Sequence, residues 1–454
     1  MKILIAGGGK VGSSLIKELS AENHEITLIE RRASTIERLC QMYDIMGIEG
    51  NCATMRVLRD ADTENADLLI AVTDADEINL LCCVAAKQIN PDIHTIVRIR
   101  NTEYADQVAE LQEAFGLSLT VNPELSAARE IERLIRYPGF LKREPFAGGR
   151  VELVELRLDE NSVLNGVQLK NISSVINTRV LVCAVLRGGK ATLPKGDFVL
   201  KADDRIFVTA PAAQLTILLR SLGIITHKVR RVILAGGGRI SFYLAQMLLK
   251  GGLTVNIIDN NPARCDILAR DLPGAEISLG DAAFPAVLDR EGVADCDAFI
   301  TLTGLDELNV IISLYAMNQG VPIVITKQSH TDAVREILDK LKLGSVISPK
   351  ELCSDIIVRY VRAMRDTDGD TAVAVQTVAD GRVEACEFIL GPAAMHQKTP
   401  LKDIKFRPNV LIAAVTHKGT TTIANGLTEF ETGDSVVVIS SGDRVVSRFN
   451  DIFA

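Results

Sequence analysis

Short apolar runs alternate with amphipathic stretches through the first 136 residues of the chain. Residues 3–6 are apolar and run directly into three glycines, after which Leu15, Ile16 and Leu19 follow a helical pattern. Further apolar runs predict strands over residues 25–29, 44–48, 68–72, 95–98 and 119–121, and helical patterns cover residues 77–89, 104–115 and 123–136. Strands that alternate with helices predict a parallel, doubly wound α/β sheet.

The pattern changes after residue 136. Tyr137-Pro138-Gly139, Pro145 and Gly148-Gly149 are typical of a linker. Residues 151–158 then alternate between apolar and charged side chains, which predicts a half-buried strand. Further strands are predicted over residues 180–186, 198–200 and 206–208, with a helix over 213–221. We therefore expect a small α+β domain in this part of the chain.

The chain then repeats both parts. RVILAGGGRIS (231–241) repeats KILIAGGGKVG (2–12), residues 303–309 repeat residues 73–79, and residues 401–404 resemble residues 169–172. The register holds over more than two hundred residues, so the sequence predicts a tandem duplication of a two-domain unit. We expect Rossmann-like domains at 1–140 and 227–366, each followed by a small α+β domain, at 141–226 and 367–454.

The glycines of the first repeat have the spacing Gly7-x-Gly9-x-x-Gly12 between a strand and a helix, which is the dinucleotide-binding fingerprint. Such glycines allow a tight turn, close approach of the backbone to a pyrophosphate, and packing of helix on strand. The free N–H groups of the helix then face the anion. Glu30 ends the next strand, where a carboxylate would hold the ribose hydroxyls.

The second repeat has Gly236, Gly238 and Asp259 at the corresponding positions, but Ser241 replaces the third glycine. We expect this serine to loosen the packing of helix on strand slightly, so that the two sites differ in affinity or in preferred nucleotide. A carboxylate at the strand end repels a 2′-phosphate, which disfavours NADP. It does not separate NAD(H) from ATP or ADP.

Further candidates lie at the ends of later strands. Thr73 and Asp74 follow the fourth strand, and Asp74 could instead cap the next helix. Arg98 ends the fifth strand and could pair with a phosphate or with a neighbouring unit. The predicted nucleotide-binding residues are Gly7, Gly8, Gly9, Lys10, Val11, Gly12, Glu30, Asn51, Thr73, Asp74 and Arg98 in the first copy, and Gly236, Gly237, Gly238, Arg239, Ile240, Asp259, Asp281, Thr303 and Lys327 in the second.

Composition excludes several kinds of partner. The formal net charge is −8, aromatic residues make up 4% and Trp is absent, so the chain lacks the basic and stacking surfaces of a nucleic-acid-binding protein. No apolar run reaches the roughly eighteen residues of a membrane span. The nine cysteines show no metal-ligand spacing, so we expect reduced thiols, no metal site and a cytosolic location.

Sequence provides little support for catalysis. His24, His94 and His227 precede strands, and His330 is more typical of a loop or cap than of an acid or base. No Walker lysine follows the glycines. We expect nucleotide binding without chemistry. An NAD-dependent oxidoreductase with duplicated Rossmann domains remains the alternative, and a nucleotide-binding subunit of another transporter is a third.

Five segments resemble tandem RCK (KTN) units, the nucleotide-binding regulators of bacterial Trk-type potassium uptake. They are GGGKVG (7–12), Glu30, TDADEIN (73–79), IVRIR (96–100) and RVELVELRL (150–158). The resemblance implies a cytoplasmic protein, peripheral at the inner face of the cell membrane, that assembles as a ring-like homo-oligomer, a tetramer. It implies a membrane-embedded Trk potassium channel subunit as partner, with NAD(H), ATP or ADP changing the ring's shape. We expect hinges at residues 137–150 and 365–370.

Overall fold

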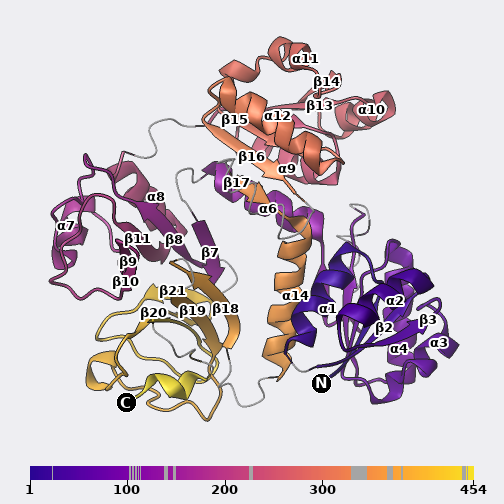
Figure 1. Cartoon of the computed structure of the whole chain (residues 1–454), viewed down its shortest axis with the longest axis horizontal. Coiled ribbons are helices and arrows are strands. Elements are labelled where there is room, and N and C mark those ends of the chain that lie inside the picture. The colour runs from indigo at the N-terminus through magenta and orange to yellow at the C-terminus, as the bar shows by residue number, and fades with distance from the viewer. Residues whose placement is uncertain are drawn as a thin grey trace. The chain divides into compact units, whose positions relative to one another are not determined.

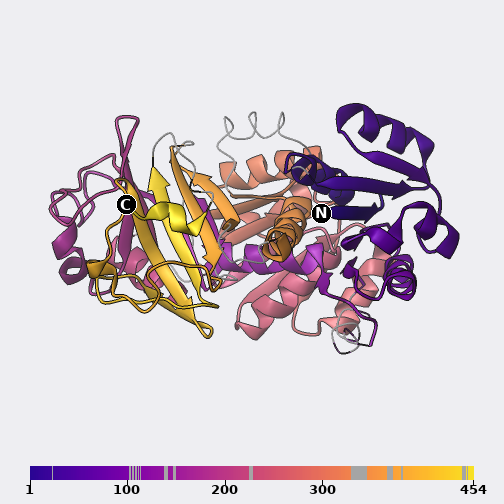
Figure 2. The ribbon, with the colours of Figure 1, turned by 90° about the horizontal axis from the view of Figure 1, so that it is seen from below.

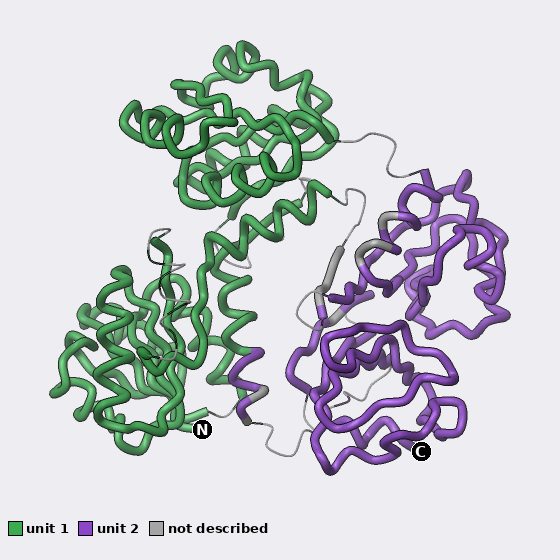
Figure 3. Tube along the Cα trace, turned by 180° about the vertical axis from the view of Figure 1, so that it is seen from behind, with its two compact units in different colours: residues 1–136, 229–358 green, residues 137–228, 359–454 purple. Residues whose placement is uncertain are grey.

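The computed structural model describes residues 1–22, 24–101, 104, 107, 110, 112, 114–136, 142–146, 150–223, 229–328, 345–365, 372–379, 382–441, 446 and 448–454. They form two compact units, one of residues 1–136 and 229–358, the other of residues 137–228 and 359–454 (Figure 3). The expected domain boundaries, the second predicted hinge apart from Arg365, His330 and most of the predicted helix 104–115 lie outside the described residues, so those predictions stay untested.

The first repeat forms a six-stranded parallel sheet with the strand order β3-β2-β1-β4-β5-β6 (Figure 1). This is the predicted doubly wound sheet, and its strand order reverses between β1 and β4, where such sheets bind ligands. Its strands are β1 (Lys2–Ala6), β2 (Glu25–Glu30), β3 (Met46–Glu49), β4 (Leu68–Ala71), β5 (His94–Arg98) and β6 (Leu119–Val121). Its helices are α1 (Lys10–Ser20), α2 (Ala33–Met42), α3 (Met55–Asp60), η1 (Thr63–Asn65) and α4 (Asp76–Ile89).

The second repeat forms an equivalent sheet with the order β14-β13-β12-β15-β16-β17. The tandem duplication of this fold is therefore confirmed. The strands are β12 (Arg231–Ala235), β13 (Thr254–Asp259), β14 (Glu276–Leu279), β15 (Ala298–Thr301), β16 (Ile323–Lys327) and β17 (Ser345–Ile347). The helices are α9 (Arg239–Lys250), α10 (Pro262–Asp271), α11 (Pro285–Arg290), η4 (Val293–Asp295) and α12 (Asp306–Asn318).

Helix α6 (Pro123–Arg136) follows the last strand of the first sheet but packs against the second repeat. Its buried residues Ala127, Ala128 and Ile131 belong to one core with Leu244 of α9, and Asn122 Nδ2 donates to the Tyr243 hydroxyl at 3.0 Å. Helix α14 (Pro349–Arg365) follows the last strand of the second sheet. Burial raises the pKa of its Cys353 thiol to about 12. The charge of Arg98 of the first repeat lowers this pKa, and that of Glu124 raises it. Helix α6 of the first repeat therefore covers α9 of the second.

The second unit contains two antiparallel five-stranded sheets, one from each small domain (Figure 1, Figure 2). The first consists of β7 (Lys142–Phe146), β8 (Val151–Arg157), β9 (Leu181–Arg187), β10 (Lys190–Thr192) and β11 (Arg205–Pro211), with η3 (Leu169–Asn171), α7 (Ile172–Ile176) and α8 (Ala212–Ser221). The second consists of β18 (Ala372–Val378), β19 (Val383–Ile389), β20 (Val410–His417), β21 (Thr420–Ile423) and β22 (Ser435–Ser441), with η5 (Leu401–Asp403) and η6 (Phe449–Ile452).

Two predictions for the first small domain are wrong. The predicted linker contains strand β7, in which Pro145 is tolerated because β7 is the edge strand of its sheet. Residues 198–200 form no strand beyond a single bridge between Gln168 and Val199, and β10 was not predicted. The short apolar run was too weak a signal to separate a strand from an apolar loop.

Strand β8 is buried on both faces, whereas the sequence predicts a half-buried strand. Val151 and Leu153 share a core with Val383 and Ile439 of the other small domain, and Val154 belongs to the core beneath α7 and α8. The charged residues of the pattern, Glu152 and Glu155, are 1% and 4% exposed. Glu155 forms an ion pair with Arg205. The charged residue in the alternating pattern of β8 is thus buried with a partner and does not mark a face exposed to solvent.

Candidate functional site

The two glycine turns have the same backbone geometry. Gly7 and Gly236 have φ of +106° and +109°, which favours glycine, and Gly9 and Gly238 precede the helices in extended conformation. A Cβ on Gly12 would lie 1.9 Å from the Gly7 carbonyl oxygen, so helix α1 starts as close to the turn as a glycine permits. Val11 and Ile240 point into the cores, and Lys10 and Arg239 are exposed.

Ser241 is accommodated in the second turn by a hydrogen bond. The residue is 0% exposed, and its hydroxyl donates to the carbonyl oxygen of Gly236. The serine therefore adds a polar contact at the point where we expected only looser packing. It stabilises the second turn by a different interaction from that of the first.

The acidic residue at each second strand end fastens the glycine turn to the sheet. The Gly8 N–H donates to Glu30 Oε2 at 2.7 Å, and the Arg31 and Arg32 N–H groups donate to Oε1 at 2.9 and 3.1 Å. Burial alone would raise the pKa of Glu30, but the three backbone hydrogen bonds lower it by more than burial raises it. The pKa of Glu30 is therefore below its ordinary value. Asp259 repeats the arrangement, since the Gly237 N–H donates to its Oδ2 at 2.6 Å.

A buried asparagine holds each fourth strand end, and sequence analysis missed it. Asn79 Oδ1 accepts from the Thr73 N–H at 2.8 Å and from the Thr73 hydroxyl at 2.6 Å, while its amide donates to the Arg98 carbonyl at 3.0 Å. Asn309 makes the same contacts with Thr303 and Lys327. The presence of an asparagine at the same position in both copies was the sequence feature that could have indicated this role.

The cationic side chains at the ends of the fifth strands already donate hydrogen bonds to backbone carbonyls of the chain. The Arg98 guanidinium donates to the Thr73 carbonyl, and the Lys327 ammonium donates to the Thr303 carbonyl. Burial is the main cause that lowers the pKa of both groups. Arg98 is 7% exposed, so a phosphate could reach it only from the strand edge.

The remaining predicted residues lie at the same edge with local partners. Asn51 Oδ1 accepts from the Ala53 N–H at 3.1 Å, and Asp281 Oδ1 accepts from the Ala283 N–H at 2.9 Å, as in Asx turns. Asp74 is exposed and lies 3.8 Å from Arg98. The predicted capping of the next helix by Asp74 is wrong, because the N-cap residue of α4 is Ala75 and no side chain caps the helix. Asp76, the first residue of α4, instead accepts with Oδ2 from the N–H groups of Arg100 and Asn101 in the loop after β5.

Charges from both repeats meet at Glu124, in the first turn of α6. Burial is the main cause that raises the pKa of Glu124, against the opposing effects of Arg100, Arg98 and Arg239. Within the described part of the chain, its Oε2 is buried without a hydrogen-bond partner. The positive charge of Lys10, in the first glycine turn, likewise lowers the pKa of Lys327 in the second repeat. Charged groups of the two repeats therefore influence one another at this edge.

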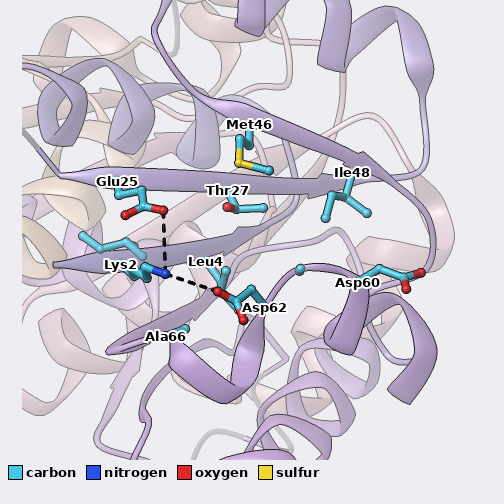
Figure 4. A pocket seen from close by; sticks show the side chains of 11 residues that line it. Lys2, Leu4, Glu25, Thr27, Met46, Ile48, Asp60, Asp62 and Ala66 are labelled. Atoms are coloured by element: carbon cyan, nitrogen blue, oxygen red, sulfur yellow. Dashed lines mark hydrogen bonds and ion pairs between the residues drawn. The ribbon is translucent and has the colours of Figure 1, made fainter.

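A pocket opens at the opposite edge of the first sheet, where the strands begin (Figure 4). The Lys2 ammonium lies in it, 3.2 Å from Asp62 and 3.9 Å from Glu25. Parallel sheets of this type bind ligands at the carboxyl ends of their strands. This pocket therefore lies at the edge opposite the one where such sheets bind ligands.

The described residues contain no group of three or more His, Cys, Asp or Glu side chains arranged to hold a metal. In the same part of the chain, no helix has the length and apolar character needed to cross a membrane.

Family comparisons match most of the chain. The TrkA-N domain model matches residues 3–123 and again residues 232–349, and the TrkA-C domain model matches residues 153–223. A Trk system potassium uptake protein TrkA homolog of Archaeoglobus fulgidus is 32% identical over 453 residues, covering 100% of both chains. The Trk system potassium uptake protein TrkA of Halomonas elongata is 31% identical and covers 100% of this chain and 98% of its own.

Comparison of structures supports the fold. The GsuK channel bound to NAD superposes with a TM-score of 0.62 at 18% identity, over 97% of this chain and 76% of its own. At this identity the likeness shows the fold alone. It extends to both repeats and both small domains, since nearly the whole chain is covered.

Proposed function

Because the chain belongs to the TrkA family of Trk system potassium uptake proteins, we propose that it is the nucleotide-binding regulatory subunit of a Trk-type potassium uptake system. Its partner is a membrane-embedded potassium channel subunit, which it meets at the inner face of the cell membrane. It acts there as a ring-like homotetramer and binds no nucleic acid. Nucleotides change its conformation and so the opening of the channel.

The single observation that carries the proposal is the pair of equivalent glycine turns, each fastened by a carboxylate at the next strand end. Gly8 and Gly237 donate to Glu30 and Asp259 in the same geometry. The helix N–H groups after each turn would take the phosphates, and the carboxylate would take the ribose hydroxyls. NAD(H), ADP and ATP all present this adenosine phosphate part, whereas the 2′-phosphate of NADP would meet the carboxylate.

Charges shared between the repeats support the proposed conformational effect. A ligand shifts an equilibrium only by its difference in affinity for the two shapes. The charge of Lys10 lowers the pKa of Lys327, and the charge of Arg239 lowers the pKa of Glu124. A phosphate bound in either glycine turn would therefore change the electrostatic interaction between the two repeats. Nucleotides with different numbers of phosphates would therefore favour different spacings of the repeats.

We propose that binding proceeds without catalysis. The oxidoreductase alternative needs an acid or base at the glycine edge, and the cations there are held on carbonyl groups of Thr73 and Thr303. The alternative predicts consumption of NADH with a small substrate. The regulator predicts that NADH is recovered unchanged.

The test is potassium flux through the membrane subunit of the same system, reconstituted in vesicles with the full chain. We expect flux to change when ADP is exchanged for ATP or NADH, and to lose that response when both Glu30 and Asp259 are replaced by Ala. Flux that ignores nucleotides, or steady oxidation of NADH, would overturn the proposal. Vesicles without the chain are the control.

A further inference from the structure

Helix α14 is shared by the two compact units of the chain. Its residues 349–358 belong to the first unit and its residues 359–365 to the second, so the division falls within the helix (Figure 3). In the first unit, Leu352 packs against the core that contains α9, and Ile357 is 0% exposed. The helix between Leu352 and Arg359 is about two turns long, so a movement at one end reaches the other.

The start of α14 is connected to the strand ends of the proposed second nucleotide site. The Lys327 ammonium donates to the Thr303 carbonyl. The next residue, Gln328, donates its N–H to the Ile347 carbonyl at 2.8 Å. Ile347 ends β17, and α14 begins shortly after it at Pro349. A phosphate that engages Lys327 would therefore disturb a strand end that leads directly into α14.

Near the other end of α14, Arg359 forms an ion pair with a buried carboxylate of the second small domain. Its Nη2 donates to Glu387 Oε1 at 2.7 Å, and the Ser435 hydroxyl donates to the same oxygen at 2.7 Å. Glu387 lies on β19 and is 1% exposed, and all three residues belong to the second unit. Removing one partner of such a buried pair is costly, so the pair fastens the helix to this sheet.

The first small domain holds the equivalent carboxylate from within its own sheet. Glu155 corresponds to Glu387, since each is the third residue from the end of its strand, β8 or β19. Arg205 corresponds to Ser435, since they are the first residues of the partner strands β11 and β22. Glu155 forms its ion pair with Arg205. The cation beside this carboxylate therefore comes from the sheet in the first copy and from α14 in the second.

We propose that Arg359 is a positioning residue that passes a nucleotide-dependent movement of α14 to the sheet of the second small domain through Glu387. The equivalent carboxylate of the first small domain is held by Arg205 and does not follow this helix. Coupling of this kind requires that the nucleotide and the ion pair bias the same movement of α14. The transmission rests on the proposed nucleotide site, whereas the contribution of Arg359 to the stability of β19 does not.

The first test compares hydrogen exchange of the full chain with that of two variants, R359A and R359A/S435R, without nucleotide. We expect R359A to speed exchange in β19 and β22 at least about tenfold, because it removes a cation from beside the buried Glu387. R359A/S435R should restore slow exchange, because it supplies a cation from the position that Arg205 occupies in the first copy. Unchanged exchange in R359A, or no restoration in the double variant, would overturn the assigned pairing.

The second test measures the change in hydrogen exchange when ADP is added. In the original chain and in R359K, which keeps the charge, we expect ADP to change exchange in both α9 and β19. R359A/S435R should lose the change in β19 and keep that in α9. R205A is the matched control, because it removes the equivalent ion pair of the first small domain and should keep both changes.

A response of β19 to ADP that persists in R359A/S435R would overturn the transmission through Arg359. A chain in which ADP changes exchange nowhere would refute the proposed nucleotide site and the transmission with it. The pairing of Arg359 with Glu387 would still be decided by the first test, which uses no nucleotide.

Discussion

Glu30 accepts hydrogen bonds from three backbone N–H groups, and these bonds set the pH dependence of its contribution to stability. The bond from Gly8 joins the glycine turn to β2, while those from Arg31 and Arg32 are local. The pKa of Glu30 is lowered from the ordinary value of 4.5, because the hydrogen bonds from Gly8, Arg32 and Arg31 outweigh burial. A group with a lowered folded-state pKa stabilises the fold above its unfolded pKa and loses this effect as the pH falls through the folded value.

We predict that Glu30→Gln lowers the free energy of unfolding by roughly 1 kcal/mol near neutral pH, since the charge-assisted bonds become neutral ones. The difference from the original chain should shrink as the pH falls below 4.5. Urea unfolding at a series of pH values measures it. A difference that stays constant into acid would show that the Glu30 charge is unimportant to the turn.

We also predict that Asn79→Ala costs about 2–3 kcal/mol of stability, because it removes the hydrogen bonds of Asn79 to the part-buried Thr73 N–H and to the buried Arg98 carbonyl. Thermal and urea unfolding would report this loss. Asn65→Ala is the matched control, since Asn65 is exposed and bonds only to Asp62. Equal effects of the two substitutions would contradict the assigned role of Asn79.

Individual site residues were partly predictable. Glycine spacing and the acid at the next strand end follow directly from the sequence, because both are local features with a fixed chemical purpose. Arg98 was expected to pair with a phosphate or with a neighbouring unit, and Lys327 occupies the corresponding strand end. Their hydrogen bonds to strand-end carbonyls depend on a side-chain direction that spacing does not encode. Asn79 was missed because a buried asparagine has no periodic signal, although its repeat at Asn309 was visible.

Helix α1 leaves no room for a side chain at Gly12, in its first turn, whereas α9 has Ser241 at the same position, bonded to the carbonyl of Gly236. We predict that Gly12→Ala destabilises the first repeat by about 3 kcal/mol, because the added methyl overlaps the Gly7 carbonyl. Ser241→Gly should cost only about 1 kcal/mol, for one hydrogen bond and some backbone freedom. Similar losses measured in urea for both variants would contradict this reading of the two turns.

Helix α6 packs on the other repeat, so we predict that Ile131→Ala loosens the second repeat and not the first. The loss should be about 3 kcal/mol, and hydrogen exchange should quicken in α9 but not in β1. Ile99→Ala is the matched control, because Ile99 is equally buried but belongs only to the core of the first repeat. Faster hydrogen exchange in β1 on replacing Ile131 would refute the packing of α6 on the second repeat.

Periodicity predicted most helices and strands of both sheets but not their partners. The apolar face of α6 is visible in the sequence, and nothing in its pattern says that it covers α9. Strand β8 was expected to have a solvent face because Glu152 and Glu155 alternate with apolar residues. Its second face is buried by the other small domain, and such long-range packing is beyond local pattern.

Across the chain, duplication produces two similar sites with different surroundings. The repeats share their turns, carboxylates and buried asparagines, while Ser241 and the charges around Glu124 distinguish them. We infer that the chain uses one binding chemistry twice and makes the two sites respond differently. This asymmetry was only partly visible in sequence, because the charge cluster forms where the repeats meet.

The most direct test of the account is calorimetric titration of the full reduced chain with NADH, NAD, NADP, ADP and ATP. We predict binding of the nucleotides with a free ribose edge at both glycine turns, weak binding of NADP, and loss of one site in each of Glu30→Ala and Asp259→Ala. Absence of binding, or unchanged binding when both carboxylates are removed, would contradict the central claim that these turns are nucleotide sites.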